Sequence, residues 1–277
     1  MPELPEVEAV RRRLAPVMEG HRIADVDIRR PDLRLPFPRR FRARLKGQRV
    51  LRLTRRAKYL LAALGSTETL LMHLGMSGSF RIEMRPRSVR RGASVAARHD
   101  HVVFSMDSHV VIHFNDPRRF GYMDLITPRQ LAGHPVLSRL GPEPLSEEFD
   151  AAALARACAR RSAPLKVVLL DQRVVAGLGN IYASEALHVA GLAPHRRASS
   201  IATPGGAPRP AAYRLTRAIK QVLLSAIERT SSRRYRSSRF RVYDREAERC
   251  LRIGCGGTIR RRSQAGRSTF YCPVCQR

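Results

Sequence analysis

The stretch Cys250-Leu251-Arg252-Ile253-Gly254-Cys255, followed by Cys272-Pro273-Val274-Cys275, decides how the end of this chain folds. It holds four of the five cysteines among 277 residues. Two thiolates that leave one tight turn can reach the same ion, and a second pair completes a tetrahedron with no position left for water. Disulfides or unrelated thiols are the alternatives, but the first residues do not read as a signal peptide and glycines flank the first pair. The spacing therefore predicts one structural zinc ion.

Basic residues dominate the zinc module and the whole chain. Lys and Arg number 52 against 23 Asp and Glu, which gives a formal charge of +29. Such an excess is typical of a protein that binds a polyanion. A genome that favours Arg would explain the choice of Arg over Lys but not the shortage of acids. Membranes are the other polyanionic surface, but no apolar stretch approaches the roughly 20 residues that span a bilayer. The sequence therefore predicts nucleic acid, and no membrane, as the partner.

The first half of the chain reads as short strands. Apolar or alternating runs separated by turn residues cover segments 23–28, 50–53, 59–64, 69–74, 80–84, 102–106, 110–114 and 122–126. Many short strands at close spacing favour a β-sandwich. Ahead of them, Val7, Val10 and Leu14 recur at helical spacing behind Pro5. A helix is therefore expected to begin almost at the N-terminus.

The second half reads as helices. Glycines and prolines crowd residues 128–149, as is typical of an interdomain linker. Helical periodicity then covers segments 150–160, 165–171, 181–190 and 211–227. Asn180 follows a glycine turn and is expected to cap the next helix. The backbone N–H groups of such a turn can hold a phosphate, although a glycine turn between helices is more often only a turn.

These patterns together predict an α+β protein of four parts. An N-terminal β-sandwich domain with an N-terminal helix covers residues 1–127, and the linker covers 128–149. A helical DNA-binding domain follows at 150–231. The zinc-finger β-hairpin covers 232–277.

The first residues, Met1-Pro2-Glu3-Leu4-Pro5-Glu6, have a possible chemical meaning. Removal of the initiator methionine would expose the secondary amine of Pro2. An α-amine titrates at about pH 8, and beside positive charge enough of it is neutral to attack an electrophilic carbon. Glu3 is placed to protonate a leaving or ring oxygen. Composition alone favours the plainer interpretation, a proline-rich entry into a helix whose acids suit its N-terminal dipole.

Six collinear motifs reverse that preference, because the chain resembles the formamidopyrimidine-DNA glycosylase family over nearly its full length. One such match would be weak, but six in order with a terminal zinc finger are specific. The motifs are Pro2-Glu3-Leu4-Pro5-Glu6, Arg55-Arg56-Ala57-Lys58-Tyr59-Leu60, His73-Leu74-Gly75-Met76-Ser77-Gly78, Asp116-Pro117-Arg118-Arg119-Phe120-Gly121, Gly141-Pro142-Glu143-Pro144-Leu145 and Gly179-Asn180-Ile181-Tyr182-Ala183-Ser184-Glu185.

The resemblance implies a bifunctional DNA glycosylase and AP lyase of base excision repair. Pro2 is implied as the nucleophile at C1′ of the damaged nucleotide, and Glu3 as the acid and base that assists ring opening. The resulting Schiff base leads to β and δ elimination. Lys58 is implied to approach the lesion or its phosphate, where a cation favours developing negative charge. Taken without the family, Lys58 is a solvated lysine at a strand end.

The resemblance also implies how DNA is held. A damaged base must leave the stack, and Met76, Arg118 and Phe120 are implied to fill the gap and to contact the orphaned partner base. Without the family, Met76 and Phe120 would be interpreted as core residues. Phosphate contacts are implied for three further residues, the last two from a helix-two-turn-helix domain and the zinc hairpin. They are His73, Asn180 and Arg267.

Two departures from the family pattern stand out. The first zinc pair, Cys250 and Cys255, is separated by four residues instead of the commoner two, which changes a turn and not the ligand set. The segment from Glu228 to Arg241, between the last long helix and the zinc module, is about ten residues shorter than typical loop lengths lead us to expect. The family usually carries there a lid of glycine and threonine that closes over flipped 8-oxoguanine. Ring-opened formamidopyrimidines are therefore the expected substrates, with 8-oxoguanine second.

Two other functions remain as alternatives. An endonuclease VIII-like glycosylase for oxidised pyrimidines shares the nucleophile and the finger, but typically has glycine where this chain has Leu4. A non-catalytic protein that binds damaged DNA would not need Pro2, Glu3 and Lys58 intact. The resemblance further implies a monomer in the bacterial cytoplasm, associated with the nucleoid through DNA. Cys158, in an alanine-rich helix, is expected to be buried and without chemistry.

Overall fold

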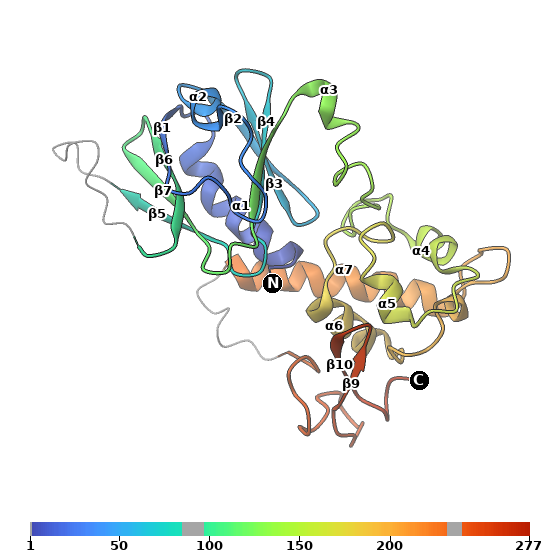
Figure 1. Ribbon diagram of the computed structural model, residues 1–277. Helices are drawn as coiled ribbons and strands as arrows, with labels where there is room; N and C mark the ends of the chain where they lie inside the picture. Colours follow the sequence, from blue (N-terminus) through green and yellow to red (C-terminus); the bar gives the residue numbers. More distant parts are fainter. Residues whose placement is uncertain (1, 85–96, 232–239) are drawn as a thin grey trace. The chain divides into compact units, whose positions relative to one another are not determined.

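The computed structural model describes residues 2–84, 97–231 and 240–277, and it divides into two compact units, Met1–Ser138 and Arg139–Arg277. The first unit is built mainly of strands, whereas the second is built of helices followed by a short hairpin (Figure 1). The α+β class is therefore confirmed. Boundaries at residues 127, 149 and 231 stay a prediction, and most of the shortened segment 228–241 lies outside the described residues.

Two antiparallel sheets of four strands form the body of the first unit. One sheet has the order β1-β6-β7-β5, made of β1 (Ile23–Ile28), β6 (Asp100–Met106), β7 (Val110–Asn115) and β5 (Ser79–Met84). The other has the order β2-β3-β4-β8, made of β2 (Val50–Arg56), β3 (Tyr59–Leu64), β4 (Thr69–His73) and β8 (Tyr122–Ile126). All eight strands expected from the sequence are present.

One apolar core fills the space between these sheets. Phe104 and Ile112 enter it from the first sheet, and Leu60 and Met72 enter it from the second. Helix α1 (Leu4–Met18) adds residues such as Leu14, which is fully buried. Because both sheets turn an apolar face to the same core, the first unit is the predicted sandwich.

Among the described residues of the second unit, four α-helices and one 3-10 turn follow the short helix α3 (Pro128–Leu131) of the first. They are α4 (Ala151–Cys158), α5 (Leu165–Leu169), α6 (Asn180–Ala190), η1 (Ala198–Ile201) and α7 (Pro210–Ser231). Helix α6 ends where Gly191 takes the left-handed conformation, with φ +70°, that commonly stops a helix. The start of α6 corrects one expectation, because its N-cap is Gly179 and Asn180 is already the first helical residue.

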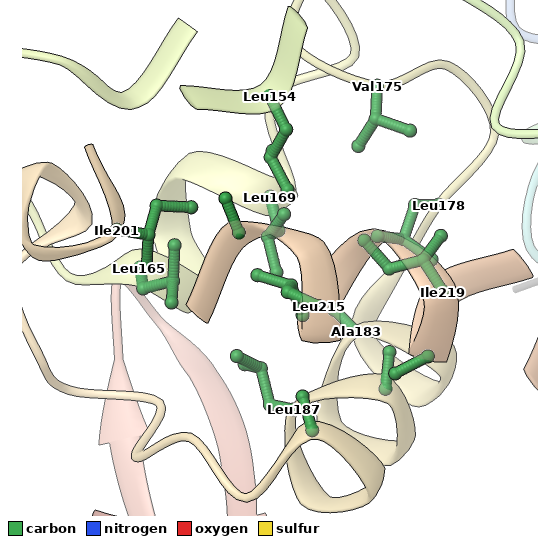
Figure 2. Close-up of a cluster of buried hydrophobic side chains, with 14 of the residues drawn as sticks. Leu154, Leu165, Leu169, Val175, Leu178, Ala183, Leu187, Ile201, Leu215 and Ile219 are labelled. Carbon is green, nitrogen blue, oxygen red and sulfur yellow. The ribbon is translucent and has the colours of Figure 1, made fainter. Parts of the chain in front are cut away.

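The core of the second unit forms around α7. Leu215 and Ile219 lie among leucines of α4, α5 and α6, and all of these side chains are fully buried (Figure 2). Cys158 belongs to the same cluster, and burial raises the pKa of its thiol to about 11. Cys158 is therefore a packed side chain with an inert thiol, as expected.

The last described segment contains a two-stranded hairpin with few buried apolar side chains around it. Strands β9 (Arg260–Gln264) and β10 (Arg267–Tyr271) pair in antiparallel register. Among the described residues, the buried core around them consists of Val242, Ile259, Phe270 and Cys272. Such a small core does not stabilise a module alone, which is the physical reason for a metal here.

The structure contains short helical elements that the sequence did not predict. Helix α2 (Phe41–Leu45), helix α3 and the turn η1 have too few residues to show a period. Within the three described ranges, none of the helices combines the length and the hydropathy that crossing a bilayer requires.

Two substitutions on α7 test the assignment of the second core. Leu215→Ala, at a fully buried position, should lower the free energy of unfolding by about 2–5 kcal/mol, because a cavity remains. Leu224→Ala, at a position 51% exposed on the same helix, should change it by less than about 0.5 kcal/mol. Urea denaturation of both variants gives the comparison, and equal losses would contradict the assigned core.

Candidate nucleic-acid site and metal centre

Helix α1 is tied along its length to strand β2, and this tie places the start of the chain. Glu8 forms an ion pair with Arg55, with Oε2 and Nε 3.3 Å apart. Further along, the N–H of Leu53 donates to Glu19 Oε1 over 2.7 Å. The helix thus runs antiparallel to β2, and residues before Glu8 extend toward the turn between β2 and β3. Lys58 lies in that turn.

Glu3 is held at the helix N-terminus by a capping box. Its N–H donates to Glu6 Oε2 over 2.9 Å, and its own side chain accepts from the backbone N–H of Glu6. Only 2% of Glu3 is exposed, whereas Pro2 before it is half-buried. The carboxylate beside the predicted nucleophile is therefore fixed in position and shielded from water.

Lys58 and His73 are close enough to influence each other. Only 7% of Lys58 is exposed, and its charge is one cause of the lowered pKa of His73. Burial is the larger cause, and together with Lys58 and Arg34 it lowers that pKa to about 4. His73 is therefore neutral at pH 7, packed against the rings of Tyr59 and Tyr122 at centroid distances of 4.9 and 5.4 Å.

The tautomer of His73 follows from one hydrogen bond. Its Nδ1 accepts from the N–H of Gly75 over 3.0 Å, so in the neutral ring the proton is on Nε2. His73 can accordingly donate one N–H to an anion such as a phosphate. Such a contact would add no buried charge, because the His73 ring is neutral.

Two loops of the first unit touch through their backbones. Gly75 has φ +59°, and a Cβ there would lie 2.2 Å from the carbonyl carbon of Phe120. Gly121 is equally confined, since a Cβ there would lie 2.8 Å from the carbonyl oxygen of His73. Only glycine permits these approaches. The loop after β4 and the loop before β8 therefore form one rigid piece.

Asp116 fastens the same two loops through its side chain. One carboxylate oxygen accepts from the hydroxyl of Ser77, and the other accepts from the N–H of Gly121 over 2.7 Å. The hydroxyl oxygen of Ser77 in turn accepts from the N–H of Arg118 over 3.2 Å. Asp116 is fully buried, so these hydrogen bonds are protected from water.

Three large side chains stand out from this rigid piece. Met76 and Phe120 are each 42% exposed, which is unusual for apolar residues of their size. The guanidinium carbon of Arg118 lies 4.7 Å from the centre of the Phe120 ring. The interpretation of Met76 and Phe120 as core residues is therefore wrong, and the loops present two apolar side chains and one cation to the outside.

In the second unit, Asn180 faces the zinc hairpin. Its Nδ2 donates to the carbonyl oxygen of Ser268 over 3.0 Å, next to the exposed Arg267 of β10. Lys166 donates to that same oxygen over 3.0 Å and to the hydroxyl of Thr269 over 2.8 Å. The helix N-terminus with Asn180 and the strand with Arg267 are thus fixed to each other.

Glu185 makes a second connection between α6 and the chain leading to the finger. Its carboxylate accepts the backbone N–H groups of Arg241, Val242 and Tyr243 over 2.8, 2.8 and 3.0 Å. Only 5% of Glu185 is exposed. A buried carboxylate with three donors is strongly stabilised, so this contact holds the finger's first residues against α6.

The four cysteine sulfurs converge as a zinc site requires. All lie within 4.8 Å of one another, with 3.8 Å between those of Cys250 and Cys275 and 3.5 Å between those of Cys255 and Cys272. Sulfurs at about 2.3 Å from a tetrahedral zinc are roughly 3.8 Å apart. A Cβ on Gly257 would lie 2.7 Å from the sulfur of Cys272, so glycine is needed beside it. Among the described residues, this is the only such group of metal-binding side chains.

The sequence did not predict the buried residues whose hydrogen bonds hold the loops and helices of this site in place. Asp116 and Glu185 belong to motifs that were recognised, but their roles as buried acceptors depend on partners far along the chain. Lys166 is 1% exposed, and its only sequence signal was a lysine inside the apolar run 165–170.

Family models match three successive parts of the chain. The formamidopyrimidine-DNA glycosylase N-terminal domain matches residues 1–123, and its H2TH domain matches 140–237. A zinc finger found in FPG and IleRS matches residues 247–277.

Relatives and solved structures agree with these models. Formamidopyrimidine-DNA glycosylases of Beijerinckia indica and Bradyrhizobium diazoefficiens are 55% and 53% identical, with both chains covered completely. A Lactococcus lactis formamidopyrimidine-DNA glycosylase, non-covalently bound to DNA with an AP site, has a TM-score of 0.86 at 30% identity, with full coverage of both chains. The MutM (Fpg) protein of Thermus thermophilus has a TM-score of 0.82 at 38% identity, covering 99% of this chain and 98% of that one.

A pair of glycine substitutions tests the contact between the two loops. Gly75→Ala should cost roughly 1–3 kcal/mol of stability beyond the cost of its positive φ, because its Cβ meets the backbone of Phe120. Gly20→Ala is the matched control, since Gly20 has φ +79° but nothing within 4 Å of a Cβ. Urea denaturation and titration with lesion-bearing duplex should show the larger loss for Gly75→Ala in both. Equal losses would mean that the loops can separate without cost.

Two serine substitutions test the metal centre. Cys272→Ser should remove zinc and weaken the binding of lesion duplex by about tenfold or more, because Arg267, a predicted phosphate contact, loses its support and a hydrogen bond to a charged group contributes at least about 1.5 kcal/mol. Cys158→Ser, also fully buried, should keep one zinc per chain. Metal content and DNA affinity are measured on both. Undiminished affinity in zinc-free Cys272→Ser would refute the role of the metal.

Proposed function

The chain belongs to the formamidopyrimidine-DNA glycosylase family, and on that premise we propose that Pro2, once exposed by removal of Met1, is its nucleophile. The protein is a DNA glycosylase of base excision repair with the AP lyase activity general to this family, and its partner is damaged duplex DNA. One observation carries the assignment of residues. Glu3, next to Pro2, is buried and fixed by its capping box on the helix that is tied to β2, the strand leading to Lys58.

The first step joins the enzyme to the sugar. The nitrogen of Pro2 attacks C1′, the bond from C1′ to the damaged base breaks, and the base leaves with the proton that the Pro2 nitrogen gives up. Glu3 gives a proton to O4′ as the sugar ring opens, so that an iminium forms between Pro2 and C1′. Because Glu3 is 2% exposed, water does not compete for that proton.

The later steps cut the strand. The iminium acidifies the C2′ proton, whose loss expels the 3′ phosphate in β elimination. A second loss of a proton expels the 5′ phosphate in δ elimination. Lys58 is the proposed cation beside the departing phosphate, where a mostly buried charge stabilises developing negative charge better than a solvated one. The same positive charge favours the neutral, nucleophilic form of a nearby amine.

Eversion of the damaged nucleotide leaves a hole in the duplex. We propose that Met76 and Phe120 enter it and that Arg118 contacts the partner base on its hydrogen-bonding edge. The contact between the two loops supports this role, because side chains that separate stacked bases must resist displacement. The position of Arg118 over the Phe120 ring suits a residue that stacks while it donates.

We further propose that three side chains contact phosphates of the DNA backbone, namely His73, Asn180 and Arg267. The protonated Nε2 of neutral His73 supports its part in this proposal. The roles of Asn180 and Arg267 are supported by the hydrogen bond from Asn180 to the carbonyl oxygen of Ser268, the neighbour of Arg267 in β10. Such contacts place the duplex without reading its sequence.

The substrates and the cellular location of the protein are also proposals. Ring-opened formamidopyrimidines are the expected lesions, with 8-oxoguanine second because the segment 228–241 is short. We propose that the protein acts as a monomer on nucleoid DNA in the cytoplasm, a proposal that rests on the bacterial origin of the relatives and on the DNA-bound solved structure. Leu4 supports a purine enzyme over the endonuclease VIII-like alternative, which typically has glycine at this place.

Borohydride trapping on duplexes with one defined lesion each tests nucleophile and substrate together. The processed chain should form a covalent complex with formamidopyrimidine duplex, and peptide mapping should place the reduced adduct on the nitrogen of Pro2. A variant that retains Met1 should trap at least about 100-fold less, since the amine is blocked. An adduct on a lysine would move the nucleophile elsewhere. Trapping confined to oxidised pyrimidines would favour the alternative enzyme, and no trapping at all would favour a mere binder.

A further inference from the structure

Helix α6 reaches the zinc centre with its last turn. His188 lies eight residues after Asn180 on this helix and is 1% exposed. Its Nε2 is 3.3 Å from the sulfur of Cys250 and 3.7 Å from that of Cys275. No mechanism described above uses this buried imidazole, although it touches two of the four zinc ligands.

The protonation state of the sulfurs decides which atom of this contact is the hydrogen-bond donor. A cysteine bound to zinc is a thiolate, which accepts hydrogen bonds and has no proton to donate. A ring nitrogen 3.3 Å from such a sulfur is stabilising only if it carries the proton. Cys250 also accepts from the backbone N–H of Arg252 over 3.4 Å. Two N–H groups therefore converge on this one sulfur.

The charge of the centre explains why donors are needed. Four thiolates around one Zn²⁺ carry a net charge of −2, and a partly buried site must compensate it by hydrogen bonds or nearby cations. Arg252 contributes a cation, and its guanidinium donates to the carbonyl oxygens of His188 and Val189. The end of α6 and the first cysteine pair thus hold each other through the backbone of Arg252, its side chain and the imidazole.

We propose that His188 is a fifth residue of the zinc site, donating its Nε2–H to the zinc-bound thiolate of Cys250. It is a positioning residue and not a metal ligand. Because α6 presents Asn180 at its other end, this hydrogen bond connects the metal to a proposed phosphate contact. The inference rests on the zinc site and on the phosphate role of Asn180, and it does not depend on Pro2 as the nucleophile.

The hydrogen bond has a chemical consequence for the thiolate. Donated N–H groups withdraw electron density from sulfur, so a zinc thiolate with two donors reacts more slowly with peroxide or alkylating agents. An oxidised sulfur no longer binds zinc, and the finger's small core cannot hold β10 without it. His188 should therefore slow the oxidative loss of zinc.

Release of zinc under hydrogen peroxide, followed with a chromogenic chelator, tests this in the full-length zinc-loaded protein. His188→Leu should release zinc at least about fivefold faster than the parent, the change expected for one hydrogen bond. His188→Gln, which keeps an N–H donor, should recover part of that difference. His195→Leu is the matched control, since His195 lies in the same unit, is exposed and packs against Tyr271. Its release rate should equal that of the parent.

A spectroscopic measurement separates the hydrogen bond from simple packing. Long-range proton–nitrogen NMR of the zinc-loaded protein should place a proton on Nε2 of His188, and ¹¹³Cd substitution should reveal coupling between that proton and the metal. A ring protonated on Nδ1 alone, or equal zinc release by His188→Leu and His195→Leu, would overturn the proposal. Borohydride trapping of the same variants is read separately. Failure of trapping in the parent would contradict the nucleophile and leave the result on His188 unchanged.

Discussion

The convergence of four sulfur atoms within 4.8 Å is the constraint on which the zinc hairpin of the second unit depends. In the part of the chain that the structure describes, the hairpin's buried core has four residues, too few to offset the entropy of ordering the segment around it. Metal binding supplies that free energy, because a ligand of the folded state stabilises it. Residues far from the sulfurs benefit from this. Arg267 on β10 is positioned only as long as the hairpin exists, and Asn180 on α6 keeps its hydrogen bond to Ser268 on the same condition.

Buried polar groups extend this constraint from the finger to the helices. Lys166 and Glu185 are each buried, and each is satisfied by backbone atoms of the segment that follows α7. Removing either would leave charged or polar groups in a dry place without partners. Such contacts contribute specificity as well as stability, because only one arrangement of α6 and the hairpin satisfies them all.

In the first unit, the corresponding constraint is the direct backbone contact at Gly75 and Gly121. It fixes two loops so that Met76 and Phe120 can stay exposed without collapsing onto the sandwich. Most apolar residues of this size are buried, so leaving two of them outside costs free energy that the rigid loops must offset. The helix α1 shows the same principle at the N-terminus, where a capping box holds Glu3 beside Pro2.

The sequence by itself determined the strands, most of the helices, the zinc ligands and the family. Each of these depends on local patterns: alternation with period two, recurrence with period 3.6, paired cysteines and contiguous motifs. The exposure of Met76 and Phe120 followed from the family resemblance but not from their residue types. Only the tertiary structure decided that Asn180 begins α6 instead of capping it, and that Lys166, Glu185 and His188 support the finger. These roles depend on partners tens of residues away along the chain, such as Ser268 for Lys166 or Cys250 for His188. A local pattern carries no information on which distant atoms meet, because burial and hydrogen bonding are settled only when the chain packs.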